Sequence, residues 1–96
     1  MIKSFKDRTT EAIFDGLSTK DSRKFPGNLH SVAKRKLDYL NVAKRIDDLR
    51  VPPGNRLEAL SGDLKGFHSI RINDQWRITF RWEEGDCYEV SICDYH

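Results

Sequence analysis

The sequence predicts an α+β fold, in which an N-terminal strand and two helices cover one face of a mainly antiparallel sheet of four to five strands. Apolar residues recur every three or four positions from Leu29 to Leu40, and more weakly to Leu49, which indicates an amphipathic helix. After residue 67 they alternate with polar residues, which indicates half-buried strands. Because the helical pattern precedes the strand pattern, the helices are expected to segregate to one side of the sheet.

The first half of the chain is expected to hold one short strand and two helices. The strand is MIKSF, the first five residues, and Asp7 can cap a helix that ends at Gly16. The polar segment 17–28 contains proline and glycine and predicts a surface loop. Asn28 is the expected cap of the second helix.

The second half is expected to form a meander of about four strands, around RLEALSG, HSIRI, WRITFRW and CYEVSI. Their register must keep apolar residues on one face, because a slip of one residue reverses every side chain. A turn over residues 73–75 then sets Ile70 opposite Ile78 and Arg71 opposite Arg77.

The next hairpin is expected to turn over residues 84–86. This register sets Trp82 opposite Tyr88 and Arg81 opposite Glu89. The second of these is a favourable cross-strand charge pair, which supports the register.

Like charges directly opposite on a sheet are destabilising, so the predicted arginine pair needs an explanation. One is that Glu58 on the neighbouring strand neutralises it, and the other is that the pair binds an anion such as phosphate, which arginine holds in a fork. Continuing the last strand puts Tyr95 diagonal to Arg77 on the same open face. Asp94 and His96 then point to the other side, near the sheet's edge.

These residue types suit the cleavage of RNA through its ribose 2′-hydroxyl. His96 titrates near neutral pH and suits proton transfer. Asp94 could accept a proton or orient the imidazole, and Tyr95 could stack on a base or bind the phosphate. Arg71 and Arg77 could stabilise the developing charge, so this chemistry calls for no metal and no cofactor.

Composition predicts one globular domain over residues 1–96, since 38% of residues are hydrophobic and 33% are charged. The net charge of +2 does not by itself indicate a nucleic-acid partner. The sequence contains no long apolar run, so neither a signal peptide nor a membrane span is expected and the expected location is the cytoplasm.

Cys87 and Cys93 fall on one strand about 20 Å apart, too far for a disulfide, and are expected to be reduced thiols. With His96 they match no standard metal-ligand spacing.

The run RLEALSGDLKGFHSIRINDQWRITFRWEEGD, followed by the terminal DYH, resembles the HigB toxins of the RelE-like superfamily. The resemblance covers essentially the whole chain and is densest from Val51 to His96. It implies a RelE-like fold and the toxin of a type II toxin–antitoxin system, a ribosome-dependent endoribonuclease that cleaves translated mRNA in the A site and so inhibits translation and growth. The implied partner is a HigA-like helix-turn-helix antitoxin, and operator DNA is bound only through the antitoxin complex.

The resemblance also implies residue roles. The expected catalytic residues are Arg77, Asp94, Tyr95 and His96, and the expected substrate-binding residues are Arg71, Glu58 and Lys65. Some relatives use a histidine and a lysine where this chain has Glu58 and Ser61, so either Glu58 acts as the base or Arg71 supplies the missing positive charge. The alternative is a module that binds RNA or a partner without cleaving, a degenerate toxin kept for regulation, because Asp94 and His96 alternate away from Tyr95.

Overall fold

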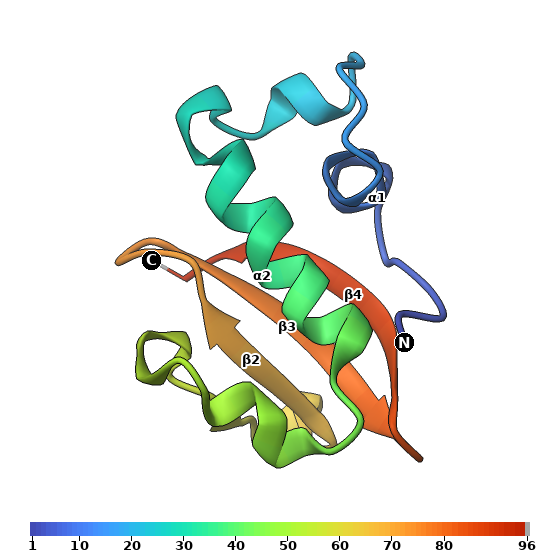
Figure 1. Cartoon of the computed structure of the whole chain (residues 1–96), viewed down its shortest axis with the longest axis vertical. Coiled ribbons are helices and arrows are strands. Elements are labelled where there is room, and N and C mark those ends of the chain that lie inside the picture. The colour runs from blue at the N-terminus through green and yellow to red at the C-terminus, as the bar shows by residue number, and fades with distance from the viewer. Residues whose placement is uncertain (96) are drawn as a thin grey trace.

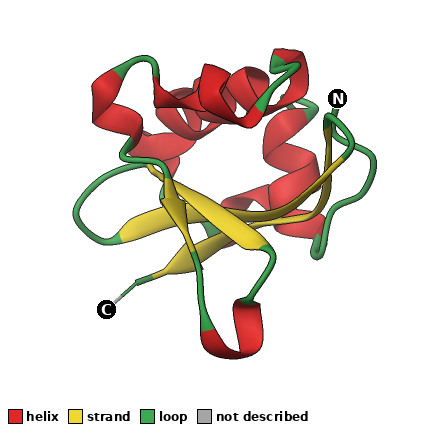
Figure 2. Cartoon of the chain, turned by 90° about the horizontal axis from the view of Figure 1, so that it is seen from below, coloured by secondary structure: helices red, strands yellow, loops and turns green. Residues whose placement is uncertain are grey.

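The computed structural model describes residues 1–95, which form two α-helices against one face of a four-stranded antiparallel sheet (Figures 1 and 2). The helices are α1 (Arg8–Phe14) and α2 (His30–Val42). The strands lie side by side in chain order, as β1 (Glu58–Ala59), β2 (Phe67–Arg71), β3 (Trp76–Glu83) and β4 (Asp86–Asp94). Short 3₁₀ turns connect them, namely η1 (Ser22–Lys24), η2 (Gly27–Leu29), η3 (Ile46–Arg50), η4 (Pro53–Asn55) and η5 (Gly62–Leu64). The predicted α+β class is confirmed.

The expected first strand is an extended segment that runs parallel to β4, joined to it by isolated bridges. Ile2 pairs with Cys87 and Phe5 pairs with Val90. The backbone N–H of Lys3 donates to the carbonyl of Cys87 at 2.8 Å. The segment therefore extends the antiparallel sheet by one parallel edge, in agreement with the predicted four to five strands.

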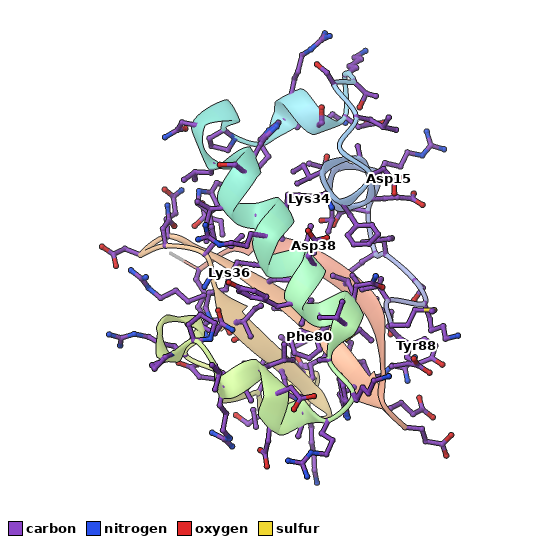
Figure 3. All side chains as sticks on the ribbon, in the orientation of Figure 1. Asp15, Lys34, Lys36, Asp38, Phe80 and Tyr88 are labelled. Carbon is purple, nitrogen blue, oxygen red and sulfur yellow. The ribbon has the colours of Figure 1, made fainter. Side chains whose placement is uncertain are left out.

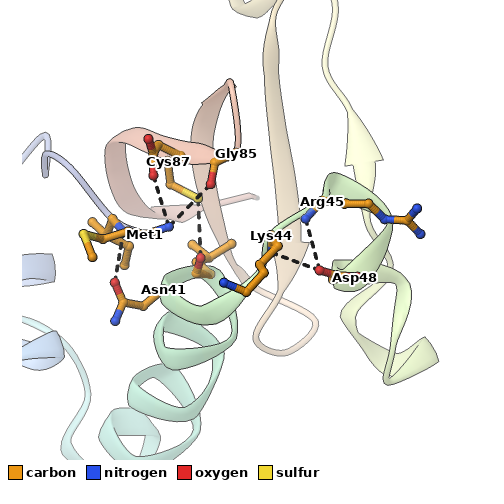
Figure 4. A network of polar contacts seen from close by, with 10 residues as sticks. Met1, Asn41, Lys44, Arg45, Asp48, Gly85 and Cys87 are labelled. Atoms are coloured by element: carbon orange, nitrogen blue, oxygen red, sulfur yellow. Dashed lines mark hydrogen bonds and ion pairs between the residues drawn. The ribbon is translucent and has the colours of Figure 1, made fainter.

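A polar network fixes the end of α2 against this edge (Figure 4). The backbone N–H of Ile2 donates to Oδ1 of Asn41 at 3.0 Å. One turn further on, Oδ2 of Asp48 accepts from the backbone N–H groups of Lys44 at 2.9 Å and Arg45 at 3.1 Å. These two hydrogen bonds hold the pKa of the Asp48 carboxyl below its usual value, since they favour the charged form.

The caps of the two helices differ from each other. Oδ1 of Asp7 accepts from the backbone N–H of Thr10 at 2.7 Å, so the predicted cap of α1 is confirmed. The prediction that Asn28 caps α2 is wrong, because the capping residue is Leu29, without a side-chain hydrogen bond. Asn28 instead lies inside η2, which runs directly into α2 and already satisfies backbone groups at the helix start.

The segment 17–28 is more ordered than a surface loop. It contains η1 and η2 and buries Phe25, whose ring meets that of Trp76 edge-on with centroids 5.0 Å apart. The weak apolar pattern as far as Leu49 is not a continuation of α2, which ends at Val42. It forms the separate turn η3, whose Leu49 is buried.

The core lies between α2 and the sheet, and Figure 3 shows Phe80 beneath the helix. The first hairpin has the predicted register, with Ile70 opposite Ile78 in the core and Arg71 opposite Arg77 on the other face. That register carries both arginines onto the side of the sheet that α2 does not cover.

The predicted register of the second hairpin is wrong near its turn. The turn has two residues, Glu84 and Gly85, both with positive φ (49° and 85°), as a tight hairpin turn requires. Trp82 therefore pairs with Cys87 rather than with Tyr88.

A β-bulge then restores the predicted pairing further along. Thr79 pairs with Ser91 and Arg81 pairs with Tyr88. Two residues of β4, Glu89 and Val90, therefore lie opposite one residue of β3, Phe80. Glu89 adopts φ +53°, the left-handed conformation that a bulge can use. The predicted charge pair forms despite the slip, with Nε of Arg81 3.4 Å from Oε2 of Glu89.

Candidate functional site

The site is built around Arg77, whose side chain from β3 is held rigidly although it carries a full charge. Its Nε donates to Oγ of Ser69 at 2.8 Å, and its Nη2 donates to the carbonyl oxygen of Arg56 at 2.5 Å and to that of Ser69 at 3.3 Å. Arg77 is 7% exposed and Ser69 is fully buried. Because a guanidinium is planar, bonds to both Nε and Nη2 fix its plane.

The Arg56 carbonyl reaches Arg77 because of an unusual backbone conformation. Arg56 follows η4 with φ +45° and ψ +57°, in the left-handed region. For a residue with a side chain this costs about 1 kcal/mol or more, and it persists only where the surroundings enforce it. The strained residue is therefore part of the support of the guanidinium.

The remaining edge of the guanidinium faces a carboxylate and an aromatic ring. Nη1 of Arg77 lies 3.8 Å from Oε1 of Glu58, and its Cζ lies 5.6 Å from the centroid of the Tyr95 ring. Glu58 and Tyr95 are 55% and 46% exposed. A fixed cation beside one loosely held carboxylate and an accessible ring can receive a phosphate and a stacked base.

The arginine pair is compensated within the described chain. Arg71, directly across from Arg77, forms an ion pair with the almost fully exposed Asp74 of the β2–β3 turn. Glu58 provides the second negative charge, as one of the two sequence-based explanations expected. Both acidic partners are exposed, so they can exchange with solvent or with another anion.

Three more residues were predicted for the site, namely Asp94, Lys65 and His96. Asp94 pairs with Trp76 across β3 and β4, so it lies on the face opposite Tyr95. Its Oδ2 accepts from Nε2 of Gln75 at 3.0 Å. Lys65 is exposed in the connection between β1 and β2. His96 lies outside the described residues.

Sequence reasoning missed Ser69 and the Arg56 carbonyl. Alternation with buried Ile70 does place Ser69 on the arginine face, so a signal for it was present. Nothing in the sequence indicates the role of Arg56, because the residues that usually adopt the left-handed conformation are glycine and asparagine.

His68 lies on the core face of β2, the same face as Ile70. Its ring stacks on Phe80 with centroids 6.1 Å apart, and its Nδ1 is buried without a hydrogen-bond partner among residues 1–95. Burial lowers the pKa of the imidazole, and the charge of Arg50 lowers it further.

The two cysteines are unpaired thiols of β4, as expected. Burial raises the pKa of the Cys87 thiol to about 12, so this thiol is inert at neutral pH. Cys93 is partly exposed and lies directly opposite Arg77 on the same face.

Residues 1–95 contain neither a metal-binding cluster nor a membrane-spanning helix. No group of three or more histidine, cysteine, aspartate or glutamate side chains is placed to bind a metal ion. Among the helices of the same residues, none combines the length and apolar character needed to cross a bilayer.

Comparison with known proteins gives the family. Residues 3–96 match the family described as "RelE-like toxin of type II toxin-antitoxin system HigB". The chain is 42% identical to "Toxin HigB-1" of Vibrio cholerae serotype O1 over 85 residues, which are 88% of this chain and 87% of that protein. It is 30% identical to "Endoribonuclease HigB" of Proteus vulgaris over an alignment of 102 positions, which covers 100% of this chain and 100% of that protein.

Two solved structures share the fold at low sequence identity. One is the YoeB–YefM complex from Staphylococcus aureus, with a TM-score of 0.61 and 14% identity over 100% of this chain and 98% of that chain. The other is a YafQ mutant from E. coli, with a TM-score of 0.57 and 12% identity over 99% and 94% of the two chains. Together with the sequence match they confirm the predicted RelE-like fold. The chain belongs to the HigB-like family of RelE-like toxins from type II toxin–antitoxin systems.

Proposed function

We propose that this toxin is a ribosome-dependent endoribonuclease that cleaves translated mRNA in the ribosomal A site and thereby stops growth. The observation that carries the proposal is the guanidinium of Arg77, locked by Ser69 and Arg56 with its free edge beside Glu58 and Tyr95. An endoribonuclease among its relatives supports the reaction class.

In the proposed complex the scissile phosphate lies against the Nη1 edge of Arg77. The guanidinium then stabilises the negative charge that develops on the non-bridging oxygens in the transition state. The exposed Tyr95 ring stacks on a neighbouring base, and Arg71 and Lys65 bind the RNA backbone by charge. The ribosome supplies the rest of the positioning, in keeping with the low net charge of the toxin.

The reaction requires one proton acceptor and one proton donor. The 2′-oxygen forms a bond to phosphorus while the bond from phosphorus to the 5′-oxygen breaks, leaving a 2′,3′-cyclic phosphate and a 5′-hydroxyl. We assign the acceptor role to Glu58, because it lies beside Arg77 whereas Asp94 lies on the opposite face. We assign the donor role to His96, which protonates the leaving 5′-oxygen, because histidine is the residue type best suited to proton transfer near neutral pH, and Asp94 orients the end of the chain. This route does not depend on a metal ion.

The family is one of toxins from toxin–antitoxin systems, which supports an antitoxin partner, and a chain of the YoeB–YefM complex shares the fold of this toxin. We infer a HigA-like antitoxin with a helix-turn-helix domain, which alone carries the toxin to operator DNA. A cytoplasmic location follows from the proposed ribosomal substrate.

Primer extension on mRNA in a translating extract tests the proposal. Wild-type toxin is expected to create new 5′ ends only when ribosomes translate the message, and Arg77→Ala is expected to lower the cleavage rate about 100-fold or more and to relieve growth arrest. Lys34→Ala is the matched control, because it removes a half-buried cation of α2 that pairs with Asp38. Ribosome stalling without new 5′ ends would instead favour the binding module that does not cleave.

A further inference from the structure

We propose that Lys36 and Asn55 are positioning residues for Arg77, acting through the backbone of Arg56. The proposal rests on the proposed function for its activity readout only. The contacts form one continuous path, from Lys36 on α2 to Asn55, then to the carbonyl of Arg56 and the guanidinium.

Lys36 is an unusual residue for the buried side of a helix. It is 7% exposed, and its Nζ donates to Oδ1 of Asn55 at 2.5 Å. Among residues 1–95 it forms no ion pair with a carboxylate. Buried lysines are normally paired with an acid, so this ammonium sits in the fold at a cost in stability. Its pKa is lowered by burial, and then by the charges of Arg35 and Arg71.

Asn55 turns this contact into a constraint on the backbone. It is fully buried, and its Nδ2 donates to the carbonyls of Leu49 at 3.2 Å and Val51 at 3.4 Å. With Lys36 bound to Oδ1, both ends of the carboxamide are satisfied and the side chain has one orientation. The turn from η3 to η4 is thereby closed.

Arg56 is the residue that follows this turn. Its left-handed conformation presents its carbonyl to Nη2 of Arg77. A strained residue keeps its conformation only while its neighbours are fixed. Loss of the Lys36 bond frees the Asn55 carboxamide, loosens the turn and allows Arg56 to relax. Nη2 of Arg77 then loses the Arg56 carbonyl, the nearer of its two acceptors, and the guanidinium keeps only its bonds to Ser69, of which the one from Nη2 is long.

The test compares Lys36→Met with Lys34→Met on the same helix. Methionine keeps the length and apolar body of lysine and removes only the charged donor. Figure 3 shows Lys36 on the side of α2 toward β2, whereas Lys34 and Asp38 lie on the side toward α1. Lys34→Met therefore removes a lysine from α2 without touching the path to Arg77.

The first readout is the ¹⁵N NMR spectrum of the Arg77 side chain, which needs no substrate. In wild type and Lys34→Met, hindered rotation about the Nε–Cζ bond is expected to give separate Nη resonances. In Lys36→Met these are expected to broaden or merge, while the melting temperature does not fall. Unchanged Nη resonances in a folded Lys36→Met would overturn the proposal.

Asn55→Asp breaks a second link and serves if Lys36→Met does not fold. It keeps an acceptor for Lys36 but loses the donor to the Leu49 and Val51 carbonyls. The Nη resonances of Arg77 are expected to merge in this variant too. If they stay separate, the constraint on Arg56 does not come through Asn55 and the proposal fails.

The second readout is cleavage. Lys36→Met is expected to lower kcat about tenfold with KM unchanged, because a misplaced guanidinium loses transition-state contacts. In an Arg77→Ala background the same change is expected to have no further effect on the residual single-turnover cleavage rate, whereas an independent role would lower that rate further. If wild type does not cleave RNA but Lys36→Met still frees the Arg77 side chain, the proposed function fails and the positioning role stands.

Discussion

The guanidinium carbon of Arg77 lies 5.6 Å from the centroid of the Tyr95 ring, so the middle strand of the sheet and the end of the chain meet on one face. The backbone N–H of Tyr95 donates to the carbonyl of Gln75 at 2.7 Å, which ties this end to the start of β3. One face of the ring is therefore occupied by a cation, while the side chain remains accessible to a ligand.

Two substitutions of Tyr95 distinguish the contribution of its ring to cleavage from that of its hydroxyl. Tyr95→Ala is expected to slow cleavage about 10- to 1,000-fold, because base stacking contributes about 1–3 kcal/mol and an exposed cation–π contact about 0.5–1 kcal/mol. Tyr95→Phe keeps the ring and is expected to stay within about threefold of wild type. Single-turnover cleavage rates measure both, and an equal loss in the two variants would assign the role to the hydroxyl.

Glu58→Gln tests the proposed proton acceptor. The variant is expected to lower kcat about 100-fold, the usual contribution of a positioned base. Binding of an uncleavable RNA, with a 2′-deoxy sugar at the cleavage site, is expected to hold or tighten, because a negative charge leaves the side of Arg77.

A second carboxylate of the same sheet is the control for this change. Glu83 pairs with Arg81 at the other end of β3 and is exposed. Glu83→Gln is expected to change neither kcat nor RNA binding. If Glu58→Gln kept its full kcat, Glu58 would not be the proton acceptor and would serve only to balance the charge of Arg77.

The sequence was sufficient for the parts of the fold that depend on periodicity. Alternation placed Ile70 opposite Ile78, and therefore Arg71 opposite Arg77, because only one register buries the apolar side chains. It was insufficient at the second hairpin, where a residue with positive φ, Glu89, adds one position to β4. Between the turn and the bulge, Cys87 rather than Tyr88 therefore lies on the core face opposite Trp82, and the apolar alternation of Tyr88, Val90 and Ile92 gives no sign of this exchange.

The candidate site divides in the same way. Arg77 and Tyr95 could be placed on one face by counting along the strands, and the structure brings their side chains together. The supports of Arg77 could not be found, because they are a backbone carbonyl and a serine hydroxyl. Backbone acceptors have no residue type, and their direction depends on tertiary contacts such as the one between Lys36 and Asn55.

Thiol labelling probes the face of Arg77 without mutation. Near neutral pH one thiol per native chain is expected to react with a disulfide reagent, because Cys93 is partly exposed while Cys87 is buried with a pKa of about 12. The adduct on Cys93 lies opposite Arg77 and is expected to block cleavage. Cys93→Ser is expected to remove the labelling and the inactivation together, and rapid labelling of two thiols in the native protein would contradict the burial of Cys87.

The pH dependence of stability reports on His68. Its pKa is lowered in the folded chain, so as pH falls below about 6.5, the usual value, the unfolded chain binds a proton before the folded chain does. The free energy of unfolding is therefore expected to be full above that pH. It is expected to decrease as pH falls from there toward the lowered folded pKa, and to change no further through this group below it.

Urea unfolding at several pH values measures this window. His68→Phe fills the space on Phe80 with a ring that cannot titrate, and it removes the buried Nδ1 that has no partner among residues 1–95. Below pH 6.5 the free energy of unfolding of the variant is expected to decrease less than that of wild type, because the variant lacks the contribution of His68. NMR titration of the His68 ring gives the folded pKa directly, and a value above 6.5 would reverse the sign of the predicted dependence.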